Sequence, residues 1–213
     1  MDIENAIRKR VTAIFTRTHA SHDLEHTLRV CTLAVKIAKA EKASLSIVRA
    51  AALLHDIGRS IEDRAKGKHD HAVIGAKMAD AILKKSGMPV EECEKVCACI
   101  RTHRFRGTNE KPSSIEAKVL FDADKLDAMG AVGIGRAFMF ASEVGAKLHN
   151  HHIDIAHTKS YTVEDTAWRE YMVKLRFLKD SMMTRTGRRL AQRRHVFMEK
   201  FFNEMNGECD GVW

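Results

Sequence analysis

"AALLHDIGRS", residues 51–60, combines an apolar run with two ionisable side chains at its end. The run stops at His55 and Asp56, and Gly58 then breaks it. Burial of such groups at the edge of a core is unfavourable unless a partner compensates them. The segment therefore predicts a buried helix that ends in a polar site, with further ligands supplied by other parts of the chain.

The sequence around this stretch favours helices. Hydrophobic residues make up 45% of the 213 residues, whereas aromatic residues make up 6% and only two prolines interrupt the chain. The dominant residue types are helix formers rather than strand formers. Apolar positions spaced by three and four residues predict the following helices: 2–18, 22–42, 46–57, 71–87, 90–103, 114–130, 131–147, 163–180 and 185–206.

These helices predict an all-α fold, with loops at 58–70, 104–113 and 148–162. The chain contains no convincing linker, so we expect one domain over residues 1–213. In this arrangement the core motifs lie within 22–130, and the C-terminal helices of 163–206 pack on them.

The composition of the chain indicates in which cellular compartment it works and which class of ligand it binds. The sequence has no apolar stretch of transmembrane length and no signal-peptide pattern, and its five cysteines predict free thiols in a reducing, cytoplasmic compartment. A net charge of +8 suits an anionic ligand, either a nucleotide or a nucleic acid. The basic run at 185–195 has its charges at mixed helical angles. We therefore interpret it as a solvated face and do not favour a nucleic-acid partner.

Candidate partners for the His-Asp pair lie on both sides of it. His26, four residues after His22, lies on the helix predicted upstream, and Asp124 interrupts the apolar stretch VLFDADKL downstream. Imidazole nitrogen and carboxylate oxygen together suit Mn, Fe, Zn, Co or Ni, and Mg binds through the oxygens. A bound ion would make the buried pair tolerable.

Three motifs in this order resemble those of the HD-domain metal-dependent phosphohydrolases: HxxRV at 26–30, ALLHDIG at 52–58 and DADKLDA at 122–128. The stretches 116–138 and 174–202 also resemble the bacterial branch related to nucleoside triphosphate pyrophosphohydrolases. The resemblance extends from about residue 20 to residue 205 and implies a helical bundle of the HD-domain type. It assigns one divalent metal ion, Mn, Mg, Fe, Co, Ni or Zn, to the following ligands: His26, His55, Asp56 and Asp124.

The activity that this resemblance implies is hydrolysis of nucleotides, with attack of metal-activated water on phosphorus. For a triphosphate, the specific form gives a monophosphate and pyrophosphate. Two alternatives stay open. HDIG also suggests a phosphodiesterase of cyclic or oligomeric nucleotides, and the basic surface suggests a catalytically silent regulator that binds nucleotides or RNA.

Four further residues are candidates for the catalytic pocket. Arg59 stands where the cyclic-dinucleotide phosphodiesterase branch has a lysine, and Lys125 follows Asp124, so both are predicted phosphate contacts. In binuclear HD proteins, histidines near the places of His71 and His103 bind a second ion. Here Arg104 follows His103, where that pattern would have a second histidine. We therefore favour one metal, with His71 and His103 as phosphate donors or proton carriers.

A separate histidine tract occurs at HNHH, residues 149–152, with His157 nearby. These side chains offer metal donors, but we interpret the segment as a polar loop.

Overall fold

The structure is a computed structural model that describes residues 3–15, 24–65, 68–105 and 110–212. The described residues form helices, turns and loops and include no strand, which confirms the all-α prediction. None of their helices is both long and apolar enough to cross a membrane. The chain divides into two compact units, 1–124 and 125–213. Packing of the C-terminal helices on the core motifs stays a prediction.

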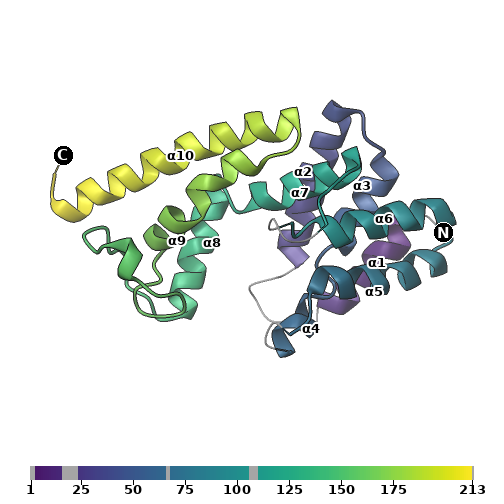
Figure 1. The fold of residues 1–213 in the computed structure, drawn as a ribbon, viewed down its shortest axis with the longest axis horizontal. Helices are drawn as coiled ribbons and strands as arrows, with labels where there is room; N and C mark the ends of the chain where they lie inside the picture. The colour runs from purple at the N-terminus through teal and green to yellow at the C-terminus, as the bar shows by residue number, and fades with distance from the viewer. Residues whose placement is uncertain (1–2, 16–23, 66–67, 106–109, 213) are drawn as a thin grey trace. The chain divides into compact units, whose positions relative to one another are not determined.

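The first unit is built around α3, which is buried on most of its surface. Its helices, labelled in Figure 1, are α1 (Ile3–Phe15), α2 (Leu24–Glu41), α3 (Leu45–Leu54), α4 (Arg59–Arg64), α5 (His71–Lys85), α6 (Val90–Thr102) and α7 (Ile115–Asp127), the last of which continues into the second unit. α3 packs against α1, α2, α5 and α6. Seven of its ten residues are buried, and burial continues past its end through His55, Asp56 and Ile57.

Local signals explain where α5 begins and ends. Asp70 caps the helix by accepting a hydrogen bond from the backbone N–H of Ala72 at 2.8 Å, which fixes His71 in the first turn. The helix ends at Lys85, and Gly87 follows with a φ of +80°. Glycine tolerates this left-handed conformation.

Two details of the first unit differ from the sequence-based expectation. The predicted loop 58–70 contains α4, whose six residues are too few to give a periodic signal. On α2 the apolar spacing of the sequence would place Leu28 in the core, but Leu28 is 37% exposed, and the buried residues include His26 and Thr27. Polar residues thus occupy core positions on the very turn that carries a predicted metal ligand.

The second unit contains α8 (Gly130–Glu143), η1 (Ile155–His157), α9 (Ala167–Val173), η2 (Leu175–Ser181) and α10 (Arg185–Asp210), the long yellow helix in Figure 1. α10 packs on α8 and η2. The prediction of one helix over 163–180 is wrong. Lys174, with φ −142° and ψ −57°, separates α9 from the 3₁₀-helix η2, in which Leu175 is buried. Its residues follow the three-residue period of a 3₁₀-helix.

Candidate metal centre

The four predicted ligands converge within the first unit. His26 comes from α2, His55 and Asp56 from the end of α3, and Asp124 from the last turns of α7. His26 Nε2 lies 3.5 Å from Asp124 Oδ1 and 3.7 Å from Asp56 Oδ2. His55 Nε2 lies 3.3 Å from His26 Nε2 and 3.7 Å from Asp56 Oδ2. Ligands of one ion held by bonds of about 2.1 Å stand roughly 3.0–3.4 Å apart, so these separations are close to those of a first coordination shell.

Hydrogen bonding fixes the orientation of the His55 ring. Its Nδ1–H donates to the carbonyl oxygen of Ala52 at 2.8 Å, so the lone pair is on Nε2 and faces the cluster. Complete burial lowers the pKa of His55 to about 4, so this ring is neutral at pH 7. A neutral imidazole and two carboxylates that converge on one point are all acceptors. Such a set is stabilised by a cation, and the donor chemistry therefore fits a divalent metal ion.

A second set of acceptors meets the other oxygen of Asp56. Oδ1 lies 3.2 Å from His71 Nε2 and 3.7 Å from His103 Nε2, and the two nitrogens are 3.2 Å apart. His103 Nδ1 donates to the carbonyl of Ile100 at 2.6 Å, and His71 Nδ1 donates to Glu62 at 2.7 Å. Both Nε2 atoms therefore carry lone pairs. Asp56, His71 and His103 have the geometry to hold a cation or to share a proton.

Glu62, which positions His71, was not predicted from the sequence. Glu62 is 6% exposed and accepts hydrogen bonds from His71, from Arg59 at 3.0 Å and from Arg104. Burial raises the pKa of this carboxyl, but the hydrogen bonds outweigh that effect and lower it to about 2. Glu62 therefore stays ionised and holds the His71 ring in the orientation that faces Asp56. It lies within the predicted loop, where no periodic pattern marked it as buried.

The structure places Arg59 beside this Glu62–His71 pair. Its Nη1 lies 3.2 Å from His71 Nδ1, and its Nε is buried without a hydrogen-bond partner among the described residues. Arg104 approaches the same ring atom at 3.3 Å. Arg104 Nη1 also lies 3.9 Å from Asp70 Oδ1, so two guanidinium groups lie next to the second acceptor set together with the carboxylates of Glu62 and Asp70.

Gly58 allows the turn after the His-Asp pair to approach α5. A Cβ atom at this position would lie 2.5 Å from the carbonyl oxygen of His71 and 2.8 Å from the backbone nitrogen of Gly75. Side chains do not tolerate such distances, so only glycine permits this backbone contact. The contact sets His71 beside Asp56.

Two residues singled out from the sequence, Lys125 and His22, are not placed at the cluster by the structure. Lys125 follows Asp124 and is half-buried, and its side chain leaves α7 about 100° away from that of Asp124. Its role as a phosphate contact stays a prediction. His22 lies outside the described residues.

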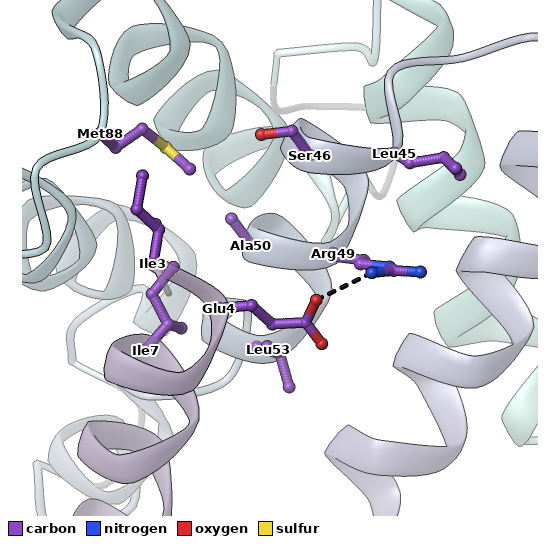
Figure 2. Close-up of a pocket in the computed structure, with 9 residues that line it drawn as sticks. All are labelled: Ile3, Glu4, Ile7, Leu45, Ser46, Arg49, Ala50, Leu53 and Met88. Atoms are coloured by element: carbon purple, nitrogen blue, oxygen red, sulfur yellow. Dashed lines mark hydrogen bonds and ion pairs between the residues drawn. The ribbon is translucent and has the colours of Figure 1, made fainter. Parts of the chain in front are cut away.

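A distinct pocket of about 380 Å³ lies between α1 and α3 (Figure 2). Figure 2 shows mainly apolar side chains around it and an ion pair on one side, in which Arg49 Nη1 lies 2.8 Å from Glu4 Oε2. None of the four predicted ligands lines this pocket. It is therefore separate from the candidate metal centre.

Known proteins resemble this chain in sequence and in fold. Residues 23–129 match the model of the HD domain. YpgQ of Bacillus subtilis is 36% identical over 97% of this chain and 93% of its own. A crystal structure of YpgQ in complex with ADP has a TM-score of 0.76, with 97% of this chain and 94% of that one covered.

Two further comparisons extend this result. The structure of an HD-superfamily hydrolase from Bacillus thuringiensis is 29% identical, with a TM-score of 0.76, and covers 98% of this chain and 96% of its own. Ribonuclease Y of Chloroflexus aurantiacus is 28% identical over 53% of this chain, but this match spans only 19% of its own length. The family match and the YpgQ relationship together show that the chain belongs to the HD-domain family.

Proposed function

We propose that this protein is a divalent-metal-dependent phosphohydrolase that acts on nucleotides and that its specific reaction converts a nucleoside triphosphate to a monophosphate and pyrophosphate. The observation that carries the proposal is the convergence of the buried His26, His55 and Asp56 with the partly exposed Asp124, whose facing atoms are nitrogen and oxygen acceptors. YpgQ, a relative along nearly the whole chain, has been crystallised with ADP. Its ligand supports a nucleotide as the substrate class.

One ion, held by these four residues, would supply a Lewis acid that lowers the pKa of a bound water and polarises a phosphoryl oxygen. Asp56 and Asp124 carry the negative charge that such an ion requires, and the Ala52 carbonyl keeps the His55 lone pair directed at it. Burial of His26 and His55, at 3% and 0% exposure, excludes bulk water from the ligand side.

In this proposal His71 and His103 accept and donate protons during the reaction. Their Nε2 lone pairs face Asp56 Oδ1 from 3.2 and 3.7 Å, so a proton accepted there is shared with a carboxylate and stabilised by it. Protonated, either ring becomes a donor to a phosphate oxygen. The guanidinium groups of Arg59 and Arg104 add positive charge next to them and favour an anionic substrate.

The experiment that tests the proposal is hydrolysis in ¹⁸O-labelled water. Metal-free protein is reloaded with Mn²⁺ and given nucleoside mono-, di- and triphosphates and cyclic nucleotides. Attack at the α-phosphorus of a triphosphate places the label in the monophosphate and releases pyrophosphate without label. Label in orthophosphate would indicate attack at the terminal phosphorus, and no turnover with any divalent metal would contradict the proposal.

A phosphodiesterase activity is the second candidate, and the partial similarity to ribonuclease Y favours it. The second acceptor set at Asp56 is compatible with a phosphodiester substrate. Short RNA and cyclic dinucleotides therefore belong in the same assay. Cleavage of these substrates with intact triphosphates would select the phosphodiesterase, and tight RNA binding without cleavage would select a regulator.

A reducing, cytoplasmic setting is part of the proposal. All five cysteines are thiols, and Cys209 is exposed. Burial raises the pKa of Cys97 to about 11 and that of Cys99 to about 12, which keeps these thiols protonated and unreactive.

A further inference from the structure

We propose that His151, His152 and Asp210 form a second metal site, which lies wholly within the second unit and takes a transition-metal ion of the Zn²⁺ or Ni²⁺ class. The ligand atoms of these three residues lie within 4.8 Å of one another. The sequence alone favoured a polar loop for the histidine tract. The structure brings two of its rings to one carboxylate at the end of α10.

The distances describe a three-point chelate. His151 Nε2 lies 2.9 Å from Asp210 Oδ1 and 3.1 Å from Oδ2, and His152 Nε2 lies 2.8 Å from Oδ1. Ligands of a tetrahedral Zn²⁺ with bonds of about 2.05 Å stand roughly 3.3 Å apart. An outward shift of about half an ångström therefore converts this hydrogen-bonded cluster into a coordination shell with an open position for water.

Both sides of the site are held in place by the surrounding chain. Ile153 N–H donates to the carbonyl of Asn150 at 3.0 Å, which closes a turn with His151 and His152 at its two central positions. Asn150 is itself buried, accepts from Thr166 and donates to the Glu164 carbonyl at 3.0 Å. The turn is therefore anchored at its base.

The third ligand has an equally defined position. Asp210 is the last residue of α10, and Gly211, with a φ of +69°, closes the helix. One turn earlier, Asn206 accepts a hydrogen bond from His149 Nε2 at 2.7 Å, and the His149 ring stacks on His151 with 4.8 Å between centroids. His149 thus orients the His151 ring. Because this ring is already held in place, it loses little conformational entropy when an ion binds.

Chemistry selects the class of ion. Two imidazoles and one carboxylate suit Zn²⁺, Ni²⁺, Co²⁺ or Cu²⁺ and disfavour Mg²⁺ and Ca²⁺, which prefer oxygen ligands. The side chain of His152 is 75% exposed and that of Asp210 is 35% exposed, so solvent reaches the site directly. An ion bound there would link the turn at 150–153 to the C-terminal end of α10 and stabilise the second unit.

The test counts Zn²⁺ in tag-free protein in which His55→Ala has removed a ligand of the first centre. Zn²⁺ content after equilibrium dialysis is compared for this protein and for the same protein with His152→Ala or with His157→Ala. His157 is a matched control, because it lies in the same segment, is exposed and contacts Asp154 rather than Asp210.

The proposal predicts that His152→Ala removes one equivalent of Zn²⁺, whereas His157→Ala removes none. It also predicts that Zn²⁺ slows amide hydrogen exchange at 149–153 and 206–212 and that His152→Ala abolishes this protection. Equal Zn²⁺ content in all three proteins would overturn the proposal. Because His152 is largely exposed, its replacement leaves the fold intact.

Discussion

His71 Nε2 lies 3.2 Å from Asp56 Oδ1, while the other oxygen of the same carboxylate, Oδ2, lies 3.7 Å from His26 Nε2. Asp56 therefore connects two sets of acceptors, one with His26, His55 and Asp124 and one with His71 and His103. We propose that the first set binds the divalent metal ion and that the second set accepts and donates the proton.

This assignment predicts different outcomes for the two sets. In His103→Ala, bound Mn²⁺ should stay at the wild-type stoichiometry, and kcat should fall by about 100-fold or more, as expected when a general acid–base group is lost. Mn²⁺ suits the measurement because imidazole-rich sites elsewhere bind it weakly. A variant that loses one bound ion would show instead that His103 is a metal ligand.

Arg59→Ala should weaken catalysis without releasing metal. A lost charge-assisted hydrogen bond to phosphate corresponds to roughly 1.5–3 kcal/mol, or about a ten- to hundredfold fall in kcat/KM. Arg64→Ala is the matched control, because Arg64 is exposed on the same helix and donates to the Ser60 carbonyl. Steady-state kinetics gives kcat/KM for both variants, and metal analysis gives their metal content. A wild-type kcat/KM in Arg59→Ala would show that this side chain contacts no substrate.

Glu62 predicts a defined pH dependence of stability. Its folded pKa of about 2 is below the ordinary value of 4.5. The carboxylate therefore contributes stability that is fully present above about pH 4.5 and is lost as the pH falls toward 2. The difference in unfolding free energy between wild type and Glu62→Gln, measured by denaturant titration, should shrink across this range. A difference that is independent of pH would contradict the assigned hydrogen bonds.

Gly58→Ala should destabilise the first unit by about 1–3 kcal/mol or more, because the added Cβ meets backbone atoms of α5 that have no room to move. Gly135→Ala is the control. Gly135 is an exposed helical glycine, and outside its own turn of the helix no heavy atom lies within 4 Å of the added Cβ, so alanine should stabilise the helix by up to about 1 kcal/mol. Similar unfolding midpoints for the two variants would exclude the close approach at Gly58.

The sequence predicted those features that depend on long periodic patterns or on ordered motifs. Apolar spacing and Gly87, with Pro89 just beyond, predicted a helix over 71–87, and the structure has this helix as α5, which ends two residues earlier at Lys85. His26, His55, Asp56 and Asp124 were grouped by motif order, and the structure brings them together, although their role as ligands stays a proposal.

Features that depend on tertiary contacts could not be predicted from the sequence. Glu62 is buried only because α4 packs against α5, and a six-residue helix has no period to reveal that. The break at Lys174 has no glycine or proline to mark it. Asp210 lies 58 residues after His152, and nothing in the spacing of the chain indicates that the two side chains meet.

The central claim is that His26, His55, Asp56 and Asp124 hold the ion on which hydrolysis depends. The most direct measurement is the content of Mn²⁺ and the rate of triphosphate hydrolysis in Asp124→Ala, with helical content followed by circular dichroism. Asp124 is a partly exposed side chain (19%), so the fold should persist, and Glu116→Ala on the same helix, where Glu116 accepts from the Ser44 N–H, is the control. We predict that Asp124→Ala loses both metal and hydrolysis by more than about 100-fold while it stays helical. Wild-type metal content and wild-type turnover in Asp124→Ala would contradict the account.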